Sequence, residues 1–239
     1  MQSNRVLHWV VARIKFLSGI NLDFKVSIRE YINMSTLAEA LQSKRVNVCS
    51  GIFLAVIWGI FAYAHMLGFL KTHQWSLLLF CFSETLVVTF YLFRSRPKTI
   101  SVNPLDWIIA IGGTFTPLFF RPALWGILPL ANIAIIAGAF FQILSIISLN
   151  RSFALVAAKR EIKTGWMYRI VRHPLYASYC LVFLGYVLTN TTLANVLVYL
   201  IAMVFLCIRI FREEKHIALD PLYCEYMLKV HYRLIPYIF

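Results

Sequence analysis

The chain has 239 residues, of which 60% are hydrophobic, 15% are aromatic and only 14% are charged. Soluble domains carry nearly twice that share of charged residues, so the composition excludes an ordinary soluble fold and indicates an integral membrane protein. The net charge of +13 could suggest a nucleic-acid-binding protein. However, the basic residues lie between apolar segments and not along one polar face, so we expect no nucleic-acid partner.

Residues 1–48 form the first segment, which we expect to be cytoplasmic or interfacial. The segment contains seven Lys or Arg residues, and Arg13 and Lys15 interrupt the only run that resembles a signal peptide. An apolar stripe at helical spacing predicts a helix lying on the lipid headgroups, and a poorly ordered tail is the alternative. The stripe consists of Leu7, Val10, Ile14 and Leu17.

Six apolar segments follow, and each is compared with the roughly 20 residues needed to cross about 30 Å of hydrocarbon. The predicted spans are Cys49 to Leu70, Trp75 to Phe93, Leu105 to Phe120, Ala123 to Ser148, Pro174 to Thr189 and Leu193 to Phe211. Only Arg121 and Pro122 separate the third and fourth spans, and only Asn190 to Thr192 separate the fifth and sixth. We therefore predict an all-α, polytopic membrane protein with about six transmembrane helices and tight helical hairpins, four of the spans forming a scaffold at 49–149.

The distribution of Lys and Arg residues tests this partition. One side receives the N-terminal segment, the loops at 94–98 and 151–172 and the C-terminal tail, and with Arg209 near the end of the last span it carries 21 of the 23 basic residues. Short basic loops stay in the cytoplasm, so we expect the N- and C-termini to be cytoplasmic. The basic loop and the tail then face the same compartment and can build one site.

The sequence lacks the motifs of several other chemistries. The five cysteines contain no CxxC pair and fall mostly in or beside apolar spans, which is typical of small core side chains. The six histidines show no HExxH or other ligand spacing, so we expect no metal. There is also no glycine-rich phosphate loop and no GxSxG motif. Any nucleotide-like cofactor must be held by a different kind of site.

The longest strongly basic interval between apolar segments runs from Lys159 to Tyr179 and reads KREIKTGWMYRIVRHPLYASY. Pro174 is expected to open a helix, whose free N–H groups attract an anionic group. An anchor on the positive side of the membrane is the alternative interpretation. Basic and aromatic side chains crowd around the proline, namely Tyr168, Arg169, Arg172, His173 and Tyr176.

The order RIVRHPLYASY, with Tyr168 five residues ahead of His173, resembles the signature YxxxRHPxY of the isoprenylcysteine carboxyl methyltransferase (ICMT) family. The closing segment REEKHIALDPLYCEYMLKVHYRLIP also resembles the end of that family, in particular its bacterial branch. Two departures are Arg160 to Lys163, where the family usually has His-x-Leu-Val, and Trp166-Met167 ahead of the tyrosine. The resemblance covers about ninety residues and defines a predicted catalytic region at 150–239.

The resemblance implies a multi-pass membrane enzyme, in the bacterial inner membrane, with its cofactor site on the cytoplasmic side. Such an enzyme transfers a methyl group from S-adenosyl-L-methionine to a lipidated or lipid-like acceptor in the bilayer, here an isoprenylcysteine carboxylate. The implied cofactor-binding residues are Arg160, Glu161, Ile162, Lys163, Tyr168, Arg172, His173, Pro174, Leu175, Tyr176 and Glu213.

Two residues at the end of the sixth span are implied to be catalytic. The family carries an arginine four residues before a glutamate, and the matching residues are Arg209, which would bind the substrate, and Glu213, which would bind the cofactor. An i, i+4 separation puts both on one helical face. The chemistry agrees, because a carboxylate acceptor reacts as the anion and an arginine can hold it by charge-assisted hydrogen bonds. For Arg212, Glu214 and Lys215 we expect a solvated, ion-paired face.

Three other functions are weighed against this prediction. A phospholipid or amine N-methyltransferase would need a general base, for which Glu214 or His216 is a candidate. An NADPH-dependent sterol-type reductase has a similar C-terminal layout, but its signature reads RHPNY and this chain has Leu175 in place of the Asn. A transporter is supported only by Glu84 within the second span, for which His65 is a candidate partner.

Overall fold

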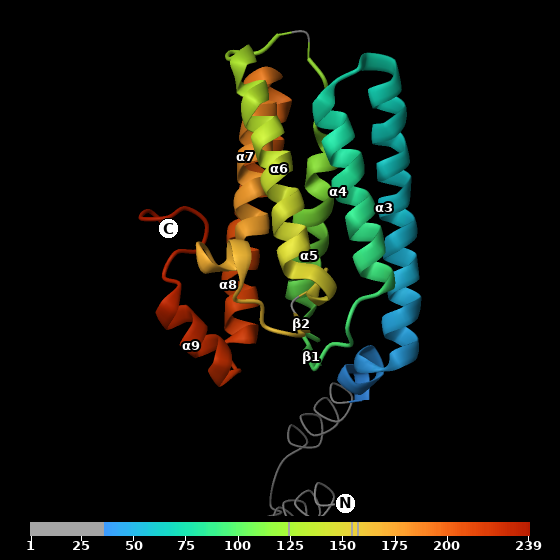
Figure 1. The fold of residues 1–239 in the computed structure, drawn as a ribbon, viewed down its shortest axis with the longest axis vertical. Coiled ribbons are helices and arrows are strands. Elements are labelled where there is room, and N and C mark those ends of the chain that lie inside the picture. The colour runs from blue at the N-terminus through green and yellow to red at the C-terminus, as the bar shows by residue number, and fades with distance from the viewer. Residues whose placement is uncertain (1–35, 124, 154, 157) are drawn as a thin grey trace, which may run out of the picture. The chain divides into compact units, whose positions relative to one another are not determined.

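The computed structural model describes residues 36–123, 125–153, 155–156 and 158–239 (Figure 1). The stripe expected to lie on the headgroups, Leu7 to Leu17, is outside the described residues. All the elements below belong to one compact unit, Ala40–Phe239.

Helices occur at all six predicted positions, and Figure 1 shows them running along one another. They are α3 (Lys44–Thr72), α4 (Trp75–Leu92), α5 (Pro104–Phe115), α6 (Asn132–Leu149), α7 (Pro174–Thr189) and α8 (Leu193–Ile217). Among the described helices, α3, α4, α8 and α6 with its flanking turns are long and apolar enough to cross a membrane. Helix α7 is apolar but shorter, with 16 residues, and α5 has 12. The all-α membrane fold is confirmed.

The basic loops and the tail meet at one end of the helix bundle. Strands β1 (Thr99–Ile100) and β2 (Ala158–Lys159) pair there as a short antiparallel ribbon, near helix α9 (Pro221–Lys229) (Figure 1). Lys159 Nζ forms an ion pair with Asp220 Oδ2 at 2.8 Å, and Asp220 also caps α9 through the amide of Leu222. Segments separated by about 60 residues are therefore joined where the sequence predicts a shared site.

The connections at the opposite end agree with the prediction in one case and differ in the other. Helices α7 and α8 are joined by Asn190 to Thr192, as expected. Helix α6, however, begins at Asn132 and not near Ala123, and the chain between α5 and α6 contains two 3₁₀ turns, Thr116–Phe119 and Pro129–Ala131. The predicted tight hairpin of the third and fourth spans is wrong, because α5 packs against α8 while α6 packs against α7.

Three prolines explain why α6 starts late. Pro117, Pro122 and Pro129 lack an N–H and disfavour a helical conformation at the preceding residue. The amides of this non-helical segment are bonded by two asparagines of the α7–α8 hairpin. Arg121 N donates to Asn195 Oδ1 at 3.0 Å, and Ala123 N donates to Asn190 Oδ1 at 2.9 Å.

Two glycines allow α6 and α7 to pack at short distance. A Cβ atom at Gly138 would lie 2.6 Å from Val182 Cγ2, and one at Gly185 would lie 2.8 Å from Ile135 Cγ1. Small residues let membrane helices approach closely. Because α7 begins directly after His173, this packing also fixes the position of the candidate site.

Replacing Gly138 with alanine is expected to lower stability by about 1 to 3 kcal/mol, because the added methyl group overpacks the interface. The loss can be measured as a lower thermal unfolding midpoint in detergent. Gly165→Ala is the matched control, since no atom lies within 4 Å of the position that its Cβ would occupy. Equal losses in both variants would contradict the proposed close packing.

Candidate active site

A cavity of about 570 Å³ lies inside the bundle and extends from the end that carries the basic loop towards the opposite end, where Leu77 and Phe120 line it. This volume is within the range of about 300 to 1,000 Å³ that is typical of small-molecule sites. Its lining combines polar residues from the loop and the tail with aromatic residues from the spans, such as Trp58, Phe61 and Phe183. Every predicted site residue except Pro174, which starts α7, lines this cavity.

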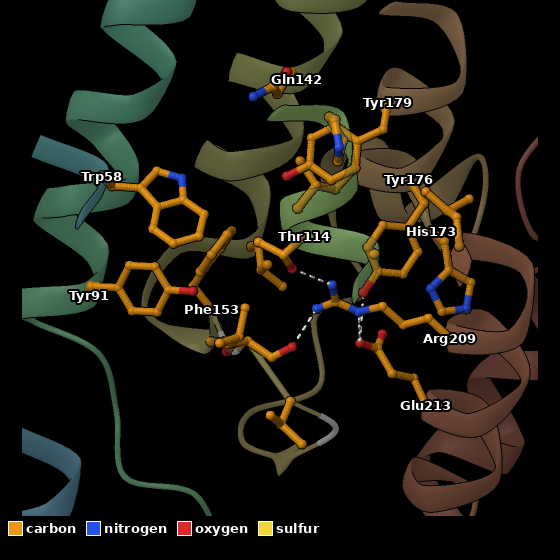
Figure 2. A pocket seen from close by; sticks show the side chains of 18 of the residues that line it. Trp58, Tyr91, Thr114, Gln142, Phe153, His173, Tyr176, Tyr179, Arg209 and Glu213 are labelled. Atoms are coloured by element: carbon orange, nitrogen blue, oxygen red, sulfur yellow. Dashed lines mark hydrogen bonds and ion pairs between the residues drawn. The ribbon is translucent and has the colours of Figure 1, made fainter. Parts of the chain in front are cut away.

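Arg209 lies at the centre of the labelled side chains in Figure 2 and connects three parts of the chain. Its Nε donates to Glu213 Oε1 at 3.0 Å, its Nη1 to Thr114 Oγ1 at 3.1 Å and its Nη2 to the carbonyl oxygen of Leu155 at 2.6 Å. Helix α8 continues to Ile217, beyond the apolar run, so the expected i, i+4 pair forms on its surface. Helix α5, the basic loop and α8 are thus held by one guanidinium.

Tyr176 completes this group from α7. Its hydroxyl donates to Glu213 Oε1 at 2.6 Å, and the Arg209 guanidinium lies 5.2 Å from the centroid of its ring. The ring of His173 stacks on Tyr176 at a centroid distance of 5.5 Å. Within the described residues both hydrogen bonds to Glu213 go to Oε1, so Oε2 can accept a donor from a ligand.

Glu214 contradicts the expected solvated face. The residue is only 6% exposed, and its carboxylate is surrounded by cations from two other segments. Oε1 lies 3.2 Å from His173 Nε2 and 3.3 Å from Arg172 Nε, while Arg233 Nε donates to Oε2 at 2.9 Å. Consecutive helical residues point in different directions. Glu213 therefore faces the cavity, while Glu214 binds the tail and the turn formed by Arg172, His173 and Pro174, called the RHP turn below. Arg212 behaves more as expected, pairing with Asp106 while about a third exposed.

The backbone just ahead of α7 is bonded by the tail. Arg172 N donates to the carbonyl of Tyr232 and His173 N to the carbonyl of Arg233, each at 2.9 Å. The tail therefore occupies the backbone donors just ahead of the helix. An anionic ligand at this end of the cavity would instead meet the Arg172 side chain, which lines it.

Aromatic residues from the tail cover Tyr168. Tyr226 donates its hydroxyl to the carbonyl of Tyr168 at 2.7 Å, and both rings pack with Tyr223 and Val230 in one buried cluster. Burial raises the pKa of the Tyr168, Tyr223 and Tyr226 phenols, so they stay neutral at physiological pH. The result is an uncharged aromatic wall beside the Arg209 group.

Comparisons with known proteins bear on what such a cavity does. A family model described as phospholipid methyltransferase matches residues 127–220, which include α6, α7, α8 and the basic loop between them. The chain is a membrane methyltransferase. Enzymes of this kind use S-adenosyl-L-methionine as the methyl donor. The match confirms the class predicted from the ICMT-like motif and favours methyl transfer over the reductase alternative.

A solved structure described as a eukaryotic intramembrane Ras methyltransferase, ICMT, without a monobody, matches at 16% identity and a TM-score of 0.41. The alignment covers 99% of this chain and 94% of that one. No curated protein matches the chain.

Several residues of the methyltransferase cavity were not predicted. Thr114 and the Leu155 carbonyl bind Arg209, and Trp58 and Tyr91 line the side of the cavity opposite His173 and Glu213 (Figure 2). The spacing of Tyr179, three residues after Tyr176 on α7, could have indicated that it also faces the cavity. For the other residues the sequence contains no such signal.

The predicted partner of Glu84 is confirmed. His65 Nδ1 lies 2.7 Å from Glu84 Oε2, so α3 and α4 are joined by a polar pair within the membrane scaffold. Both residues line the cavity of the methyltransferase. Gln142, another intramembrane polar residue, donates to Ser83 Oγ at 3.3 Å and joins α6 to α4.

Proposed function

We propose that the methyltransferase binds S-adenosyl-L-methionine at the basic end of the cavity and methylates a carboxylate on a membrane-embedded acceptor. The observation that carries this proposal is the Arg209, Glu213 and Tyr176 group. The group lines a cavity whose walls pass from the charged loop and tail to the aromatic spans. A polar cofactor and an apolar acceptor can meet at such a boundary.

The donor and acceptor groups fit the cofactor. Glu213 Oε2 can accept hydrogen bonds from its ammonium group. Arg172 can hold its carboxylate, because three basic side chains share the single Glu214 carboxylate and leave that cluster with excess positive charge. Tyr168, with the wall that covers it, offers an apolar surface for the adenine. We assign the backbone of 160–163 to the same ligand.

The acceptor carboxylate is assigned to Arg209. Of the five N–H donors of a guanidinium, three are used by Glu213, Thr114 and Leu155, which leaves one on each Nη. These can orient a carboxylate without enclosing both of its oxygens. An arginine has no acceptor atoms, so the same position suits an anion better than an amine.

The residues of the chain contribute positioning and the exclusion of water. When bound, S-adenosyl-L-methionine would supply the methyl group from its sulfonium. The bond between sulfur and the methyl carbon breaks as an acceptor oxygen bonds to that carbon, and S-adenosylhomocysteine is the product. Arg209 holds the attacking carboxylate in line, and the aromatic lining keeps water away from it. No proton has to be removed and no covalent enzyme intermediate is needed.

N-methylation of a phospholipid amine is a second candidate, favoured by the name of the matching family model. Nitrogen must lose a proton in that reaction, and the His65 and Glu84 pair lines the cavity as an acceptor. Treating the methylated product with alkali separates the two functions. A methyl ester releases methanol, whereas an N-methyl group is stable.

We further propose that the basic end faces the cytoplasm, with both termini on that side of a bacterial inner membrane. Support comes from the 21 of 23 Lys and Arg residues assigned to that side.

Calorimetric titration of the detergent-purified protein with S-adenosylhomocysteine, and in parallel with NADPH, tests the cofactor assignment. We expect binding of S-adenosylhomocysteine alone, because one end of the cavity offers a hydrogen-bond acceptor for its ammonium group and a hydrogen-bond donor for its carboxylate. Binding of NADPH alone would assign the chain to the reductases. Binding of neither compound would also overturn the proposed cofactor site.

A further inference from the structure

A second basic group on the opposite side of the cavity is not used by the methyl-transfer site. Arg160 is 7% exposed and lines the cavity, but its Nε and Nη1 have no hydrogen-bond partner among the described residues. Its Nη2 reaches only the side-chain oxygen of Asn47, at 3.4 Å. The Tyr91 hydroxyl, which also lines the cavity and is fully buried, has no partner in the described part of the chain either.

Arg94 adds a second positive charge to this group. Its Nη2 donates to the carbonyl of Asn47 at 2.8 Å, so one asparagine contacts both guanidinium groups, and its guanidinium lies 5.6 Å from the Tyr91 ring centroid. No carboxylate in the described part of the chain lies within ion-pair distance of Arg94 or Arg160. Burial, together with the nearby Arg94 cation, lowers the pKa of Arg160 to about 10, so the side chain remains charged at pH 7.

A buried cation without a counter-charge, here Arg160 with the partly buried Arg94 beside it, is costly unless an anion neutralises it. We propose that Arg160, Arg94 and Tyr91 form a subsite for an anionic phosphate group on the lipid acceptor, separate from the group that Arg209 holds. A phosphate is favoured because its several oxygens can accept from the Arg160 guanidinium and the Tyr91 phenol together, while the nearby Arg94 cation adds to the positive charge of the subsite. The inference rests on the proposed function, since it names a second point of attachment for the same acceptor.

The position of the subsite assigns it to the acceptor rather than the cofactor. Asn47 and Tyr91 come from α3 and α4, whereas the side chains proposed for the cofactor, Tyr168, Arg172 and Glu213, come from the basic loop and α8. Tyr91 faces Glu213 and His173 across the cavity, and the Arg209 guanidinium lies between the two sides (Figure 2). An acceptor bound through Arg160 would therefore approach Arg209 from the side opposite the cofactor.

The test compares three probes by titration of the detergent-purified, full-length protein: dioctanoyl phosphatidic acid, dioctanoylglycerol and inorganic phosphate. The first two share their acyl chains and differ in the phosphate. We expect wild-type protein to bind the phosphatidic acid at least about tenfold more tightly than dioctanoylglycerol, as charge-assisted hydrogen bonds imply. If inorganic phosphate bound with the same affinity as the phosphatidic acid, the assignment of the subsite to a lipid headgroup would be overturned.

Arg160→Met should remove this preference, and the affinity of the same variant for S-adenosylhomocysteine is measured in parallel. Arg96→Met is the matched control, since it removes the same charge from an exposed position on the same side of the bundle. Tyr91→Phe, which removes a single unpaired hydroxyl, should weaken the preference severalfold and keep the protein folded.

The outcomes separate the two proposals. If Arg160→Met weakens S-adenosylhomocysteine binding and spares the phosphate preference, the side chain serves the cofactor and the inference fails. It also fails if Arg160→Met and Arg96→Met behave alike. A third outcome is that the wild-type protein binds no S-adenosylhomocysteine but prefers the phosphatidic acid, and that Arg160→Met loses this preference. The proposed function then fails while the anion subsite is supported.

Discussion

Replacement of Arg209 by alanine is expected to lower kcat/KM for methyl transfer by about 10²- to 10³-fold, the usual cost of losing a charge-assisted donor at a reacting group. The variant loses the proposed hold on the acceptor and also the bonds to Thr114 and Leu155 that connect α5 and the basic loop to α8. Methyl transfer from radiolabelled S-adenosyl-L-methionine to acceptors in native membranes provides the measurement.

Two further variants make this result specific. Arg209→Lys keeps the charge, but the lysine ammonium lacks the planar guanidinium that donates to three acceptors. This variant should therefore have only slightly more activity than Arg209→Ala. Arg212→Ala, on the next turn of α8, removes an ion pair to Asp106 that does not involve the main cavity. Its activity should stay within about twofold of wild type, as is common for partly exposed pairs. Full activity in Arg209→Ala would refute the acceptor site.

Replacement of Glu213 by glutamine is expected to weaken S-adenosylhomocysteine binding by about tenfold or more, because the neutral amide loses the charge-assisted bond to the ammonium group. The affinity is measured by calorimetry in detergent. The bonds from Arg209 and Tyr176 to this position can persist with the amide oxygen, so the fold should be retained.

Glu214→Gln is the matched control, one residue along the same helix. Glu214 holds Arg172, His173 and Arg233 together, and removing one partner of a buried ion pair costs about 3 to 5 kcal/mol. We therefore expect a larger drop of the thermal unfolding midpoint in Glu214→Gln, where three basic partners share the lost charge, than in Glu213→Gln, where one does. If Glu213→Gln retained full affinity for S-adenosylhomocysteine, the cofactor assignment would be wrong.

The contrast between these two glutamates illustrates how sequence and structure divide the information. The i, i+4 spacing of Arg209 and Glu213 is local, so their shared face could be predicted once α8 was recognised. The partners of Glu214 come from the RHP turn and from the tail, and no local pattern connects them. From the segment RIFREEKH alone, a buried Glu214 therefore could not be distinguished from a Glu214 on a solvated helix face.

Arg160 gives a second example. The resemblance implied that the stretch from Arg160 to Lys163 lies along the cofactor, and the stretch does line the cavity. It did not indicate that the Arg160 side chain turns towards Asn47 and the Tyr91 side of the cavity. The contact with Asn47 spans more than a hundred residues of sequence, and both contacts depend on how α3 and α4 pack beside the loop.

The sequence by itself determined the membrane class, the positions of six helices and the methyltransferase motif. Each of these depends on nearby residues: apolar runs long enough for a bilayer, prolines such as Pro174 at a helix start, and a short ordered signature. Only the tertiary structure decided that α5 pairs with α8, that Glu214 is buried among cations and that Arg160 lacks a counter-charge among the described residues. These features depend on which surfaces meet after the helices have formed, and the free energy of packing and charge burial depends on distances that a linear pattern does not contain.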